Sequence, residues 1–200
     1  MKKFFFMFLI SVSAIFADLN EKLLSAVEDN NVLESRLLIK MGGSVESTES
    51  WLGKTPLMIA ASQNYLEMSE LLLEKGANIE AKNKDGFTSL MWAVWNGSPK
   101  TTELLINKGA NVESKTKSGD TALHLAIAQR NKEIIEILLK KGANIEAKDI
   151  KGRTPLFIAL DNEREDLVEF LINKGADINF KNKKKKKALF LALEKDSLIL

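Results

Sequence analysis

The pattern of apolar and polar positions repeats along most of the chain. A 26-residue stretch beginning at Gly53, GKTPLMIAASQNYLEMSELLLEKGAN, aligns without a gap with stretches beginning at Gly86, Gly119 and Gly152. The threonine at the third position and the glycine near the end of each stretch both recur every 33 residues. A fixed period of this length indicates a stack of repeated structural units rather than a single globular core.

Each stretch contains two short amphipathic helices. Thr55 stands where a helix N-cap belongs, and Pro56 occupies the first helical position, where its missing amide hydrogen costs nothing. The first helix ends at Asn64, and Gly76 closes the second at a position that suits a left-handed cap. The apolar positions of the two helices are Leu57, Ile59 and Ala60, and then Leu66, Met68, Leu71, Leu72 and Leu73.

An extended polar run links one helix pair to the next. The run from Asn78 to Gly86 contains one apolar residue and ends in Asp-Gly, which is typical of a hairpin-like turn. Because neither helix pair has enough apolar area to stand alone, each unit has to be covered by its neighbours. The sequence therefore predicts an all-α solenoid of stacked helix-turn-helix pairs with β-hairpin-like turns between repeats.

This unit resembles the ankyrin repeat. The resemblance rests on the G-x-T-P-L-H-x-A-like helix start, the second helix ending in L-L-x-x-G-A and the N-I-E-A-K-like hairpin, which stay in register through four units. It implies an L-shaped stack with protruding hairpins, used for protein binding. The chain is expected to be a monomer. The repeats are expected at 52–84, 85–117, 118–150 and 151–183, within an ankyrin repeat domain spanning 18–200.

Both ends of the array depart from the repeat pattern. Residues 18–51 are interpreted as an N-terminal capping repeat without the threonine-proline start, and residues 184–200 as a partial C-terminal repeat. In the capping repeat, one expected helix carries Leu19, Leu23, Leu24, Ala26 and Val27, and its partner carries Val32, Leu33, Leu37, Leu38 and Ile39.

Residues 1–17 fall outside the repeat pattern. Lys2 and Lys3 precede an apolar run that ends in small residues, which is typical of a secretory signal peptide. Cleavage is expected between Ala17 and Asp18, with a cut after Ala14 as the alternative. A retained membrane anchor is the other interpretation, although the apolar run is shorter than the ~20 residues of a spanning helix. A lipoprotein is excluded because no cysteine follows.

Composition indicates which cellular compartment and which class of partner to expect. The chain has 29 Lys plus Arg against 27 Asp plus Glu, and removing residues 1–17 leaves 27 of each. A formally neutral mature chain disfavours nucleic acid as a partner. With no cysteine there are no disulfides, thiolate nucleophiles or thiolate metal sites. An export signal on a lysine-rich chain without cysteine favours the bacterial periplasm, or secretion.

No catalytic, metal or cofactor site is expected. The single histidine, His124, occupies a position that Met58, Met91 and Phe157 take in other units. A residue replaceable by Met and Phe within one chain is interpreted as structural, and the family resemblance implies that it bonds backbone near the hairpin. The chain lacks a phosphate-binding glycine loop and an activated nucleophile.

The partner is expected to be another protein, held on the concave face by hairpin tips and the first helices of the repeats. This location is implied by the resemblance, and exposed aromatic residues are the usual anchors of an interface. Trp92 is expected to face the core instead. The candidate binding residues are Trp51, Leu52, Lys84, Asp85, Phe87, Trp95, Asn96, Ile150 and Arg153.

One strong charge run suggests an alternative function. Lys183, Lys184, Lys185, Lys186 and Lys187 fall in the last turn between repeats. They are either a solvated turn or a contact for an anionic polymer or membrane. The sequence therefore favours a non-catalytic, exported protein-binding scaffold, with an envelope-associated structural protein as the alternative.

Overall fold

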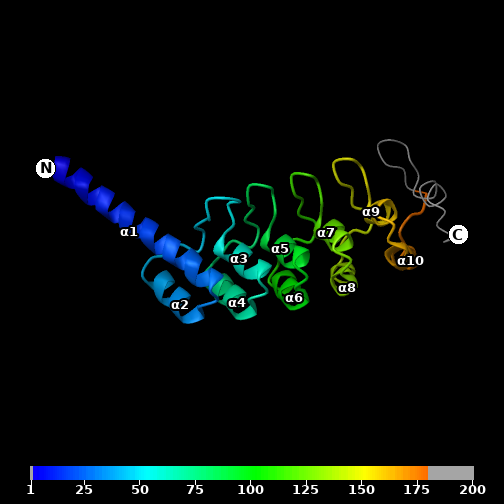
Figure 1. Ribbon diagram of the computed structural model, residues 1–200, viewed down its shortest axis with the longest axis horizontal. Helices are drawn as coiled ribbons and strands as arrows, with labels where there is room; N and C mark the ends of the chain where they lie inside the picture. Colours follow the sequence, from blue (N-terminus) through cyan, green and yellow to red (C-terminus); the bar gives the residue numbers. More distant parts are fainter. Residues whose placement is uncertain (1, 180–200) are drawn as a thin grey trace.

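The predicted all-α solenoid is confirmed. The structure is a computed structural model that describes residues 2–179, with side chains described from residue 14 onwards. Within these residues it contains ten α-helices and no strand, arranged as a row of antiparallel pairs (Figure 1). The helices are α1 (Lys2–Glu28), α2 (Val32–Lys40), α3 (Pro56–Ser62), α4 (Leu66–Glu74), α5 (Ser89–Trp95), α6 (Pro99–Asn107), α7 (Ala122–Ala128), α8 (Lys132–Lys140), α9 (Pro155–Asp161) and α10 (Glu165–Asn173).

The helices form two rows. The inner row, α3, α5, α7 and α9, lies next to the protruding hairpins, and the outer row, α4, α6, α8 and α10, lies away from them (Figure 1). Each inner helix contacts the inner helices of the neighbouring repeats and the outer helix of its own repeat. The core is continuous along the stack because every interface between repeats contributes buried apolar residues to it.

The inner helices begin as the sequence predicts. The Thr55 hydroxyl accepts a hydrogen bond from the amide of Met58 at 3.3 Å, and the Thr154 hydroxyl does the same for Phe157 at 3.3 Å. Pro56 occupies the first turn of α3, where its missing amide hydrogen is not needed. The first helix of the repeat stops at Ser62, and Asn64 then takes a left-handed conformation with φ of 60°.

Backbone hydrogen bonds hold neighbouring hairpins in register. The amide of Lys84 donates to the carbonyl of Leu52 at 2.9 Å, Lys117 donates to Asp85 at 2.9 Å, and Ile150 donates to Ser118 at 3.1 Å. A second ladder joins the bases of the hairpins, where a carboxylate oxygen accepts the backbone amide one repeat further along. Its pairs are Glu46 with Asn78, Glu80 with Asn111, Glu113 with Asn144, and Glu146 with Asp177.

The N-terminal segment continues directly into the first repeat. Helix α1 runs without a break through Ala17 and Asp18, so the expected cleavage point lies inside a helix. Helix α1 projects well beyond its partner α2 at one end of the array (Figure 1). In the described part of the chain, no helix is both long enough and apolar enough to cross a membrane.

The capping repeat buries less than its sequence suggests. Leu19, Leu23, Ala26 and Val27 of α1 are buried, as expected. On α2 only Leu38 of the five expected apolar residues is buried, whereas Leu33 is 77% and Leu37 61% exposed. Both leucines fit the apolar pattern of the expected helix, but Leu33 takes a position that is exposed in the other repeats too. Leu37 is exposed because, within residues 2–179, no repeat packs against α2 on the side away from α4. The partial repeat at 184–200 and the run Lys183–Lys187 lie outside the described residues.

Candidate protein-binding surface

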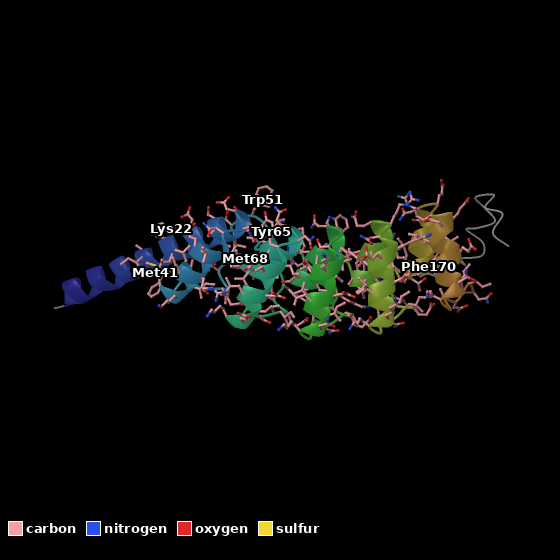
Figure 2. The ribbon with its side chains drawn as sticks, turned by 90° about the horizontal axis from the view of Figure 1, so that it is seen from below. Lys22, Met41, Trp51, Tyr65, Met68 and Phe170 are labelled. Carbon is pink, nitrogen blue, oxygen red and sulfur yellow. The ribbon has the colours of Figure 1, made fainter. Side chains whose placement is uncertain are left out.

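The first hairpin carries the most exposed tryptophan. The Trp51 side chain is 81% exposed, and Figure 2 shows it at the edge of the array. The Glu49 carboxylate fixes the backbone here by accepting the amides of Trp51 and Leu52, both at 2.7 Å, and of Lys54 at 3.1 Å. Burial tends to raise the pKa of Glu49, but these hydrogen bonds outweigh it and the pKa is lowered. Trp51 therefore projects from a stiff loop.

Lys84 ties the second hairpin to the first. Its ammonium group donates to the carbonyls of Ser50 at 2.7 Å and Trp51 at 2.9 Å. Asp85 lies beside it with an exposed side chain. Lys84 was expected to contact a partner, and the structure places it where it supports the loop that presents Trp51. Leu52 is half-buried in the same loop.

Three aromatic rings and one ammonium group meet between the first two hairpins and helix α5. The rings of Phe87 and Trp92 have centroids 5.2 Å apart, and Phe87 meets Trp95 edge-on at 6.3 Å. The Lys54 ammonium nitrogen lies 4.0 Å from the centroid of Trp92. Lys54, Phe87, Trp92 and Trp95 are called the aromatic patch below. Asn96, exposed at the end of α5, donates from its side chain to the Trp92 carbonyl at 3.0 Å.

The expectation that Trp92 faces the core is met only in part. Its counterparts in the other repeats, Ile59, Leu125 and Ile158, are 5–6% exposed, whereas Trp92 is only half-buried. Part of the larger indole remains in contact with solvent on the surface. There it lies three residues from Trp95 and therefore on the same side of the helix. The Trp92 indole nitrogen is buried, and no described residue supplies an acceptor for its hydrogen.

Ile150 and Arg153 lie apart from the aromatic patch, on the hairpin two repeats beyond Lys84. Ile150 is 56% exposed. The guanidinium of Arg153 donates from Nε to the buried Asp149 carboxylate at 2.7 Å, and the same carboxylate accepts the amides of Lys151 and Arg153. The structure thus gives Arg153 a role in shaping its own hairpin. The candidate residues Trp51, Leu52, Lys84, Asp85, Phe87, Trp95 and Asn96 share the first two hairpins and α5.

Comparison with known families shows which family the chain belongs to. The family model described as ankyrin repeats (3 copies) matches residues 23–116, 90–182 and 147–198. The chain belongs to the ankyrin repeat family. Such proteins are generally non-catalytic scaffolds for protein–protein interaction.

A plant protein shares part of this ankyrin sequence. The chain is 34% identical over 64 residues to "Probable E3 ubiquitin-protein ligase XBOS33" of Oryza sativa subsp. japonica. The match covers 32% of this ankyrin chain and 12% of the plant protein. The chain therefore spans about an eighth of that relative's length.

His124 joins two ankyrin repeats, as its expected structural role requires. Its Nδ1 accepts the amide of Thr121 at 3.2 Å, and its Nε2 lies 3.2 Å from the carbonyl of Arg153 in the next repeat. Burial lowers the pKa of His124, and the bond to Arg153 only partly opposes this effect. A neutral ring with the hydrogen on Nε2 satisfies both contacts. Within the described residues, no group of three or more His, Cys, Asp or Glu side chains could hold a metal ion.

Proposed function

We propose that this ankyrin protein is a non-catalytic scaffold that binds a partner protein through Trp51 and the aromatic patch. The observation that carries the proposal is the group of three rings at Phe87, Trp92 and Trp95, joined by the Lys54 ammonium group on the hairpin side of the stack. Trp92 and Trp95 stand where the other repeats have smaller side chains, so stacking of the repeats does not require them.

The physical properties of this surface suit a binding site. Tryptophan supplies a large contact area with few rotatable bonds, so immobilising it costs little entropy. The loop that presents Trp51 is already held by Glu49 and Lys84. Little conformational freedom is then lost when a partner binds.

The location of the protein forms a second part of the proposal. Residues 1–17 act as an export signal that delivers the scaffold to the bacterial periplasm or outside the cell, with cleavage between Ala17 and Asp18. Its composition of two lysines, an apolar run and small residues supports this assignment. The mass of the protein recovered from the periplasmic fraction tests it, since cleavage removes 17 residues and a retained segment leaves the full mass.

Binding is tested with the full chain and two matched variants. The first variant carries Trp51→Ala with Trp95→Ala, and the control carries Leu66→Ala, which removes an exposed apolar side chain from the outer helix α4. Each protein is immobilised and exposed to a periplasmic extract, and affinities for the retained protein are then measured by titration. Circular dichroism first establishes that all three have the same helix content.

The expected result is a protein that the wild type and the Leu66→Ala control bind equally. The double tryptophan variant should bind it at least about tenfold more weakly, because buried tryptophans commonly contribute 2 kcal/mol or more to an interface. Binding should persist as salt is raised, whereas adhesion through Lys183–Lys187 should weaken sharply. Equal binding by all three proteins would remove the aromatic patch from the proposed function.

A further inference from the structure

The exposed face of α2 differs from that of every other outer helix in the array. Leu33 stands where the other repeats carry Glu67, Lys100, Glu133 and Asp166, and Met41 stands where they carry Lys75, Lys108, Lys141 and Lys174. Arg36 replaces a glutamate present in all four, at Glu70, Glu103, Glu136 and Glu169. The equivalence follows from shared hydrogen bonds, since Met41 and Lys75 both donate to the residue four positions earlier.

Together with Leu37 and Lys40, these three replacements form one continuous strip. Leu33, Leu37 and Met41 are spaced four residues apart, and Arg36 and Lys40 lie beside them with the same spacing, so all five share one side of the helix. Leu33, Leu37 and Met41 are 77%, 61% and 66% exposed. We call these five residues the α2 strip. Met41 lies at the α1 end of the array (Figure 2). The Phe16 ring lies beside Gly42, the residue that follows Met41, and is 47% exposed.

We propose that the α2 strip docks on the surface of an anionic lipid membrane. A short helix with leucine and methionine on its exposed side and arginine and lysine beside them has the pattern of an interfacial helix, which lies in the plane of the headgroups. Within the described residues, neither Arg36 nor Lys40 forms an ion pair. Both cations therefore stay available to lipid phosphates.

The charges around the strip favour a lipid surface over a basic or neutral protein. Nearby Asp18 is paired with Lys22 at 2.7 Å, and Glu34 accepts the Asn31 side-chain amide at 2.8 Å. The remaining α1 acids Glu21 and Glu28 line a separate groove beside residues 47–50. Helix α1 projects beyond α2 at this end of the array (Figure 1). The strip remains on the chain whether or not residues 1–17 are removed.

Two measurements on the full chain test this inference. The first compares vesicle binding of the wild type with that of Leu33→Glu, Arg36→Glu and Met41→Lys combined, which gives α2 the residue types of the other outer helices. Vesicles contain equal parts of phosphatidylglycerol and phosphatidylcholine, or phosphatidylcholine alone. We expect the triple variant to bind the anionic vesicles at least about tenfold more weakly than the wild type, since it loses two apolar contacts and reverses one charge.

The second measurement locates the contact. Because the chain has no cysteine, an environment-sensitive dye can be attached at Leu33→Cys or at Glu133→Cys, the same position on α8. Anionic vesicles should shift the emission to the blue at 33 and not at 133. Equal shifts at both sites, or unchanged vesicle binding by the triple variant, would overturn the proposal. So would a concentration-dependent shift at 33 without vesicles, which would assign the strip to a second copy of the chain.

Failure of this inference leaves the proposed protein-binding function intact. The α2 strip lies on an outer helix of the capping repeat, whereas the aromatic patch lies on the hairpin side of later repeats. The triple variant should therefore retain the partner captured by the wild type, and the tryptophan variant should bind vesicles as the wild type does.

Discussion

Replacing His124 with methionine tests how the two repeats that it joins are held together. Met58 and Met91 occupy the same position in other repeats and are 0% and 1% exposed, so the site accommodates a methionine. The substitution removes the bonds that the ring makes with the Thr121 amide and the Arg153 carbonyl. It leaves the apolar packing of α7 largely unchanged.

The expected cost can be worked out from these contacts. Each lost hydrogen bond contributes about 1 kcal/mol to the free energy of unfolding. The Thr121 hydroxyl lies 2.9 Å from His124 Nδ1, and the two residues form a capping box at the start of α7. With two bonds lost, we expect His124→Met to lower the free energy of unfolding by about 2 kcal/mol near neutral pH.

The cost should shrink in acid. Burial lowers the pKa of His124 in the folded chain, while the unfolded value is about 6.5. Below that pH the unfolded chain takes up a proton that the folded chain resists, so wild-type stability falls as the pH drops. Methionine does not titrate, so the stability of the variant does not fall with pH for this reason. The nearby carboxyl groups of Asp120 and Asp149 are present in both proteins.

Urea denaturation followed by circular dichroism, at about pH 7.5 and about pH 5, measures both effects. The difference in free energy of unfolding between wild type and His124→Met should be smaller at the lower pH. An identical difference at both pH values would show that protonation of His124 is not linked to folding. A loss above about 4 kcal/mol would show that the site does not repack around methionine.

Two other substitutions test the hairpins. Gly119 and Gly142 have similar φ values of 77° and 87°. A Cβ added to Gly119 would lie 2.7 Å from the Ile150 amide nitrogen, whereas a Cβ added to Gly142 would have no other atom within 4 Å. Gly119→Ala should therefore cost about 1–3 kcal/mol more than Gly142→Ala in thermal or urea unfolding, and equal losses would contradict this. Asp149→Ala should cost about 3 kcal/mol near neutral pH, because three donors lose a buried carboxylate. Burial tends to raise the pKa of Asp149, but hydrogen bonds from Arg153 outweigh it and the pKa is lowered. The contribution of Asp149 to the free energy of unfolding is thus present above about pH 3.9 and is lost below it. A difference in stability between wild type and Asp149→Ala that stays constant in acid would refute the assignment.

The sequence was sufficient to predict the repeats and their internal structure. Thr55 and Thr154 cap the helices that they were expected to cap, and His124 bonds the neighbouring turn. These features depend on residues a few positions apart or on a period that recurs along the chain. Local hydrogen bonding and the need of each helix pair for neighbours are therefore visible without a structure.

Only the tertiary structure decided which large side chains are covered. Trp92 shares its register with three buried aliphatic residues, so its position in the repeat predicted burial, and Leu33 and Leu37 fitted an amphipathic helix. Exposure depends on the volume that neighbouring repeats leave for a side chain and on whether a neighbour is present. Trp92 stays partly exposed where the smaller Ile59, Leu125 and Ile158 are buried, and Leu37 lacks a neighbouring repeat on one side within residues 2–179. Leu33 takes a position that is exposed in the other repeats as well. Register along a helix fixes the direction of a side chain, but packing between repeats fixes whether it meets protein or solvent.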